Sequence, residues 1–226
     1  MCLVSYVPTD HGIIISSNRD EGVNRGEPVL VHKQMMNDKS LSFPKDIKGG
    51  TWIIHDDSDA LVLLNGAKER HERKESYRMS RGLIVLELMA QDSIMQAWMG
   101  IDLTDIEPFT LISYSSKFCL LELMWDGTEK ISTSLDNGIA HFWLSSTLYT
   151  RQEFDALKPT FEKTIGMQST PEEIASFHSA NRYEDKKGGV IIPGINTISF
   201  TQIVKKNSEV KMHYETFNNL NVDAQA

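Results

Sequence analysis

The sequence predicts an α+β fold built as a four-layer α-β-β-α sandwich, in which two antiparallel sheets are enclosed by helices. Strand-like apolar runs joined by short turns occur in both halves of the chain, which is typical of antiparallel sheets. Two helices follow one another after Ser80 and a second pair follows Thr150, so each pair can cover one sheet. With 226 residues, 40% of them apolar and 24% charged, the chain can form one sizeable core. We therefore expect a single domain over residues 1–226.

The first predicted element is a hairpin at the N-terminus. Strand-like runs over residues 2–7 and 12–17 flank the turn-forming segment 8–11. A turn centred between positions 9 and 10 makes the numbers of paired residues sum to about nineteen, with an error of about two residues. This register places Cys2 opposite Ser17.

The same signals predict the remaining elements. We expect further strands over residues 29–31, 50–55, 60–64, 108–115, 118–125, 130–134, 190–192, 195–204 and 210–216, with loops or polar segments over 22–28 and 35–42. We expect helices over residues 80–91, 92–99, 150–166 and 169–179, the last with Pro171 at its first position. Pro159 lies inside the third helix and should kink or divide it.

Composition excludes several classes of function. A net charge of −8 and a pI near 5.4 argue against a nucleic-acid surface or a broad anionic-membrane surface. No run approaches transmembrane length and no signal-peptide pattern opens the chain, so we expect a cytoplasmic protein. The two cysteines suggest neither a disulfide framework nor a zinc site, and the seven histidines are scattered, so we expect no metal.

The first residues carry a possible nucleophile. Removal of Met1 would leave Cys2 with both a thiol and a free α-amine. An α-amine titrates near pH 8, so at neutral pH an appreciable fraction can act as a base toward the thiol of the same residue. A buried cysteine that simply begins a strand is the alternative interpretation of Cys2.

Several short motifs in the first ninety residues share the order and spacing of a known family. They are Met1-Cys2, Asn18-Arg19-Asp20-Glu21, Arg25, Gly49-Gly50-Thr51-Trp52, Leu64-Asn65 and Ser80-Arg81-Gly82. On these residues the chain resembles the NRDE proteins, which include the transport and Golgi organisation protein and share the N-terminal-nucleophile (Ntn) hydrolase fold. The resemblance is faint beyond residue 91.

The resemblance implies a role for each motif residue. Cys2 would be the nucleophile, and Asn65 would donate to the oxyanion of the tetrahedral intermediate. Arg19 would stabilise the thiolate or hold a substrate carboxylate, while Asp20 would orient the α-amine. Asn18 and Glu21 are expected to help bind the substrate without contacting the reacting atoms.

Two of these assignments have a structural alternative. Asn65-Gly66 is also a strong turn signal, so Asn65 could serve the turn alone. Arg81 could bind an anionic substrate or face solvent. The charged run over residues 68–78 could be a solvated face or a flap over the site.

The leading functional hypothesis is a cysteine hydrolase of the Ntn type that cleaves a linear, non-peptide amide in a small molecule, with no cofactor. The alternative that the resemblance implies is a non-catalytic carrier of haem or another hydrophobic ligand on the same fold. A structural or partner-binding role is a third interpretation, and a homo-oligomer is compatible with all three.

Overall fold

The structure is a computed structural model that describes residues 3–22, 28–117, 119–183, 192 and 194–217. One sheet has the strand order β10-β1-β2-β11-β12, made of His141–Leu144, Leu3–Thr9, Gly12–Gly22, Ile195–Lys206 and Glu209–Thr216. The other has the order β3-β4-β5-β6-β7-β8-β9, made of Val29–Met36, Lys39–Lys45, Ile53–His55, Asp59–Asn65, Phe109–Ser115, Cys119–Trp125 and Lys130–Leu135. Every recorded strand pair in both sheets is antiparallel.

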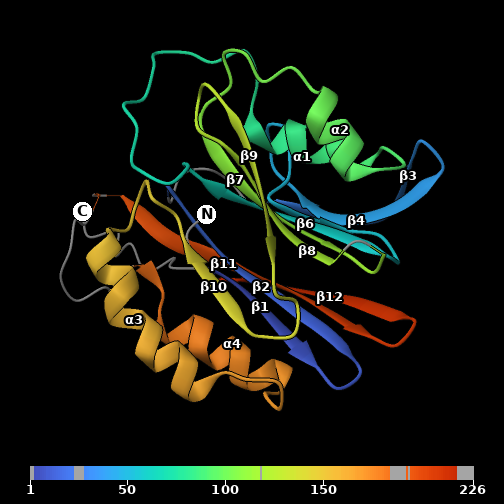
Figure 1. The fold of residues 1–226 in the computed structure, drawn as a ribbon, viewed down its shortest axis with the longest axis vertical. Coiled ribbons are helices and arrows are strands. Elements are labelled where there is room, and N and C mark those ends of the chain that lie inside the picture. The colour runs from blue at the N-terminus through green and yellow to red at the C-terminus, as the bar shows by residue number, and fades with distance from the viewer. Residues whose placement is uncertain (1–2, 23–27, 118, 184–191, 193, 218–226) are drawn as a thin grey trace, which may run out of the picture.

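The helices form the two outer layers. The helices α1 (Arg81–Met89) and α2 (Ile94–Gly100) lie on the seven-stranded sheet, where α1 contacts β5 and β6. On the other side α3 (Arg151–Thr164) and α4 (Pro171–Ala180) lie on the five-stranded sheet, in contact with β10, β2 and β11. Figure 1 shows the two helix pairs on opposite sides of the paired sheets. The predicted α+β fold of four layers is confirmed.

Alternation along the N-terminal strands assigns their side chains to two different cores. Val4 and Tyr6 of β1 belong to the large cluster between the sheets, together with Ile15 of β2. The intervening Leu3 and Val7 pack instead in the cluster under α3 and α4. Both faces of this hairpin are therefore buried, which explains why its sequence is apolar on consecutive residues rather than on alternate ones.

Two strands were missed by the sequence analysis. Residues 35–42 contain the end of β3 and the start of β4, which are joined by a turn in which Asn37 and Asp38 both have positive φ, 46° and 64°. Asparagine and aspartate tolerate this backbone conformation best among residues with a side chain, so the polar segment is a hairpin rather than a loop. The second missed strand, β10, has only four residues and directly follows a turn.

The helix predictions hold apart from one detail. Both α3 and α4 begin with a capping box, formed by Thr150 with Glu153 and by Thr170 with Glu173. Pro159 does not divide α3, which continues to Thr164. The predicted division is wrong, because the rest of the helix, including the buried Phe161, stays packed on the sheet, and the alternative of a kink stays a prediction. The predicted strand over residues 190–192 falls mostly outside the described residues.

Candidate active site

One small pocket gathers side chains from both sheets and from the start of α1. It encloses about 80 Å³ and is lined by residues of β2, β6, α1 and the segment before β5. Four of the seven residues that the sequence analysis selected line it: Arg19, Glu21, Asn65 and Arg81. The motif residues are therefore brought together although they are far apart in the chain.

A close approach of two glycines builds one wall of this pocket. A Cβ atom added to Gly50 would lie 2.8 Å from the carbonyl carbon of Gly82, and one added to Gly82 would lie 2.8 Å from the carbonyl oxygen of Thr51. The amide of Thr51 donates to the carbonyl oxygen of Gly82 at 3.1 Å. Only glycine fits where two backbones approach so closely. Gly49 next to it has a φ of +86°, so the pair Gly49-Gly50 provides both a sharp turn and the close approach.

Arg19 forms the buried charged centre of the pocket. Its side chain is 3% exposed, donates to the carboxylate of Asp46, and stacks on Trp52 with 4.1 Å between the guanidinium carbon and the ring centroid. A buried arginine is stable only when its charge is compensated, and Asp46 supplies that compensation. Sequence analysis missed Asp46. One local signal was available, because an aspartate can form an Asx turn with the residue two positions later. Here the amide of Lys48 donates to the Asp46 carboxylate at 2.9 Å.

Asn65 occupies the end of β6, where the chain turns. Gly66 follows with a φ of +85°, so the turn that the Asn-Gly pair predicts is present. The carbonyl oxygen of Asn65 accepts a hydrogen bond of 2.7 Å from the hydroxyl of Ser145, and the residue also lines the pocket. The turn and a place in the pocket are therefore compatible roles for the same residue.

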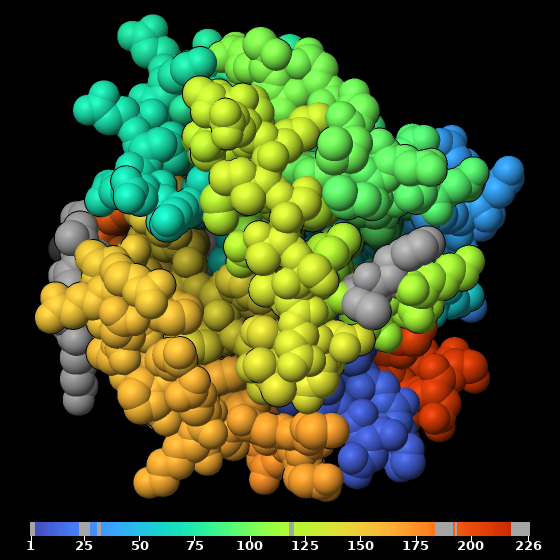
Figure 2. All heavy atoms as spheres, in the orientation of Figure 1, coloured from blue at the N-terminus to red at the C-terminus, as the bar shows by residue number. Residues whose placement is uncertain are grey.

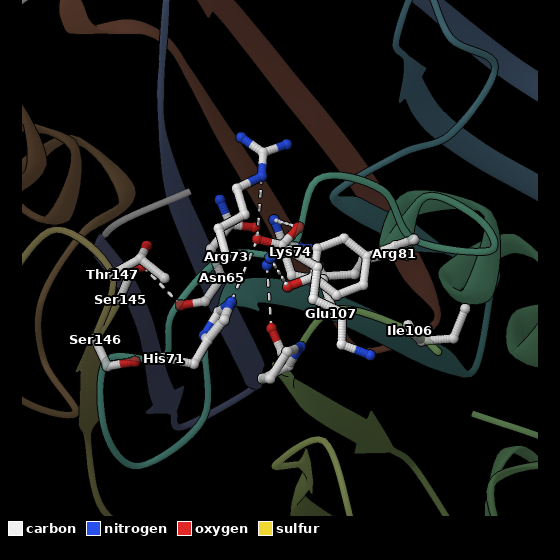
Figure 3. A network of polar contacts seen from close by, with 12 residues as sticks. Asn65, His71, Arg73, Lys74, Arg81, Ile106, Glu107, Ser145, Ser146 and Thr147 are labelled. Atoms are coloured by element: carbon white, nitrogen blue, oxygen red, sulfur yellow. Dashed lines mark hydrogen bonds and ion pairs between the residues drawn. The ribbon is translucent and has the colours of Figure 1, made fainter. Parts of the chain in front are cut away.

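Arg81, the first residue of α1, lines the pocket from the helix layer. Its guanidinium pairs with Glu107 at 3.1 Å and donates to the carbonyl oxygen of Pro108 at 3.1 Å (Figure 3). Burial lowers the pKa of Arg81 below its usual range, and the charge of Glu107 opposes that effect. His71 and Arg73 lie 3.4 Å and 3.8 Å from the same carboxylate. Arg81 is thus largely buried and paired rather than facing solvent, and His71 and Arg73 of the charged run pair with the same Glu107.

Asn18 lies on the opposite face of β2 from the pocket. Its amide nitrogen donates to the backbone carbonyl of His178 in α4 at 2.9 Å, and its amide oxygen lies 3.1 Å from Nδ1 of the same histidine. The hydroxyl of Ser5 lies 2.8 Å from Nε2. Burial lowers the pKa of His178 to about 3, so the ring is neutral. A proton on Nδ1 then satisfies all three groups, and Asn18 holds α4 on the sheet.

Asp20 is buried between β2 and β11. Its carboxylate accepts a hydrogen bond of 2.5 Å from the hydroxyl of Thr197, and that hydroxyl accepts one of 2.7 Å from the amide of Tyr183. Because the Thr197 hydroxyl oxygen accepts from the Tyr183 amide, the Thr197 hydroxyl proton is the one donated to Asp20. The strand register shifts between Thr197 and Ser199, which places this hydroxyl at an irregularity of β11.

Cys2 lies outside the described residues, so its predicted position opposite Ser17 is not tested. The described part of the hairpin pairs Leu3 with Asn18, so the paired numbers sum to twenty-one, two more than expected. Leu3 also pairs with Leu144, and the next residue, Ser145, donates to Asn65. The described part of β1 therefore begins at the edge of the fold where the pocket lies.

Among the described residues, no group of three or more histidine, cysteine, aspartate or glutamate side chains could hold a metal ion. None of the helices described is both long enough and apolar enough to cross a membrane.

Comparisons with known proteins identify the fold and the family. The family model for Transport and Golgi organisation 2 matches residues 1–217. Penicillin V acylase from Agrobacterium tumefaciens is similar in structure, with a TM-score of 0.56 and 12% identity over 96% of this chain and 83% of that one. No curated protein sequence matches this chain.

Two structures of the conjugated bile acid hydrolase from Clostridium perfringens are also similar. The variant with arginine replaced by leucine has a TM-score of 0.56 and 9% identity, over 96% of this chain and 90% of that one. The mutant with cysteine replaced by alanine has a TM-score of 0.53 and 8% identity, over 96% of this chain and 97% of that one. At such identities the likeness establishes the Ntn-hydrolase fold.

Proposed function

The chain belongs to the Transport and Golgi organisation 2 family, and from that premise we propose that it is an Ntn hydrolase that cleaves a non-peptide amide bond in a small molecule. The observation that carries the proposal is the pocket, which joins Arg19, Glu21, Asn65 and Arg81 at the edge of the fold where β1 begins. The shared fold of an acylase and a conjugated bile acid hydrolase supports the same reaction class.

In the proposed reaction the thiolate of Cys2 attacks the carbonyl carbon of the amide. The free α-amine of Cys2 accepts the thiol proton and returns it to the leaving nitrogen, so the C–N bond breaks and a thioester remains. Water, deprotonated by the same amine, then attacks the thioester and releases the acid. The side-chain amide of Asn65 donates to the oxyanion in both steps, which is worth a few kcal/mol in acyl transfer.

The contacts of Arg19 and Asp20 refine their proposed roles. Asp46 and Trp52 hold the guanidinium of Arg19 on two sides, so it is fixed in place before a substrate arrives. A fixed donor loses little entropy on binding, which suits a group that orients the substrate. Thr197 holds the Asp20 carboxylate in the same way, as expected of a residue that orients the α-amine.

The carrier alternative has less support from the described residues. The pocket of about 80 Å³ is lined by charged side chains, whereas sites for drug-sized ligands enclose about 300–1,000 Å³ and are mostly apolar. A haem does not fit those dimensions or that lining. We therefore give precedence to the hydrolase.

A parallel screen separates the two functions. Linear amides and haem are tested against the wild type, Cys2→Ala and Asn65→Ala. The proposal expects hydrolysis by the wild type, none by Cys2→Ala, and a fall in kcat of about 10²–10³ for Asn65→Ala. Turnover that survives Cys2→Ala would remove the mechanism, and haem binding without hydrolysis of any amide would favour the carrier.

A further inference from the structure

A second cleft lies next to the pocket, between the loop after β6 and the segment that enters α3. It encloses about 250 Å³, and its walls are formed by residues 68–70 and 146–151. In Figure 2 the teal loop and the yellow-orange start of α3 meet on one face of the molecule. None of the predicted site residues lines this cleft, so the mechanism above does not use it.

The cleft combines a cationic rim with an apolar floor. Lys68 and Arg70 are exposed, and within the described ranges neither side chain forms an ion pair or a hydrogen bond. Arg151 stands on the opposite wall, in an exposed pair with Asp155. The floor is Leu148, which is 9% exposed, and Tyr149. With Glu69 and Asp155 counted, the rim keeps a net positive charge in a chain of net charge −8. Lys68 and Arg70, unpaired among the described residues, indicate an anionic ligand with an apolar body.

The cleft and the pocket share a supporting segment. Ser145 donates to the carbonyl oxygen of Asn65 at 2.7 Å, and Ser146 donates to the carbonyl oxygen of Glu69 at 3.4 Å. A Cβ atom added to Gly66 would lie 2.3 Å from the hydroxyl oxygen of Ser146. Figure 3 shows Ser145, Ser146 and Thr147 on one side of Asn65 and Arg81 on the other. Residues 145 and 146 therefore pack against the backbone of both Asn65 and the wall of the cleft, which makes the pocket and the cleft neighbours.

We propose that the cleft is the subsite for a carboxylate-bearing apolar group, which makes the substrate an anionic amphipathic amide. Its volume lies just under the range of drug-sized pockets, so the group is a short chain or a single ring. The identity of the substrate rests on the proposed hydrolase, but the binding of the group does not. Carboxylate binding can therefore be measured without catalysis.

The binding test uses three probes of equal chain length: octanoate, octan-1-ol and octylamine. Titration calorimetry on the full chain should show octanoate binding more tightly than the other two. The double variant Lys68→Glu with Arg70→Glu should weaken octanoate by about tenfold and leave octan-1-ol within about twofold. The control is Lys117→Glu, an exposed lysine in the β7–β8 turn, at the opposite end of β7 from Asn65; it should bind octanoate like the wild type.

The outcomes distinguish this inference from the proposed reaction. Cys2→Ala should bind octanoate as the wild type does, and charge-dependent binding without hydrolysis of any amide would retain the subsite while removing the hydrolase. Equal binding of the three probes, or an unchanged octanoate affinity in the double variant, would overturn the subsite. Hydrolysis that prefers acidic amides equally in the wild type and the double variant would also overturn it while retaining the hydrolase.

Discussion

Protonation of His178 should limit the stability of the protein in acid. The ring is fully buried, and its neighbours Ser5 and Asn18 suit the neutral form. Burial lowers its pKa from a usual value of 6.5 to about 3. Between those values the unfolded chain binds more protons than the folded one, so the free energy of unfolding falls as the pH falls. This contribution is complete above pH 6.5 and is lost as the pH approaches 3.

The size of the effect follows from the shift. One pH unit within the interval corresponds to about 1.4 kcal/mol, and the whole interval to about 5 kcal/mol, similar to the lower limit of stability for an entire domain. Urea denaturation of the wild type and His178→Gln, in unit steps from about pH 7 to about pH 4, measures it. Below about pH 6 the wild type should lose about 1.4 kcal/mol more per unit than the variant. Parallel pH profiles for the two proteins would refute the reasoning.

Three further predictions concern the fold around the site. Gly82→Ala should cost about 1–3 kcal/mol of stability because its Cβ meets a neighbouring backbone, whereas Gly100→Ala, with nothing within 4 Å, should be neutral or slightly stabilising; equal effects in urea denaturation would contradict this. Thr170→Ala removes a helix cap and should cost about 1 kcal/mol in the same assay, so an unchanged midpoint would show the capping box to be unimportant. Glu107→Gln removes the charged partner of Arg81 and should lower the free energy of unfolding by about 1–3 kcal/mol in urea denaturation. Because the pair is largely buried, high salt should leave that loss unchanged, and a loss that disappears in high salt would contradict this.

The fold was predictable wherever one local signal decided an element. Apolar residues at helical spacing predicted α3, and Pro171 at the first helical position predicted the start of α4. The capping boxes at Thr150 and Thr170 agree with both starts, because a hydroxyl followed three residues later by glutamate satisfies the first amides of a helix. The β3–β4 hairpin was missed because its signals are short. In β4 only Leu41 and Phe43 alternate with serines before Pro44, and the polar turn at Asn37 and Asp38 resembles a loop.

The site was predictable only as a set of residue types in a known order. Motif resemblance selected Arg19, Asn65 and Arg81, which do line one pocket. The partners that fix them, Asp46 and Glu107, were missed because those contacts depend on how the two sheets and α1 come together.

The assignment of Asn18 shows the same limit. It sits beside Arg19 in the chain, but adjacent strand residues point to opposite faces, so it contacts α4 instead of the pocket. Its partner His178 is 160 residues away in the sequence. No local pattern could have linked the two.

The proposed reaction requires that Cys2, with its own α-amine free, is the nucleophile. The most direct measurement is the intact mass of the purified protein before and after brief treatment with iodoacetamide at neutral pH. The adduct is then assigned to Cys2 or to Cys119. We expect a mass without Met1 and a single rapid adduct on Cys2. A retained Met1, or alkylation of Cys2 no faster than that of Cys119, would contradict it.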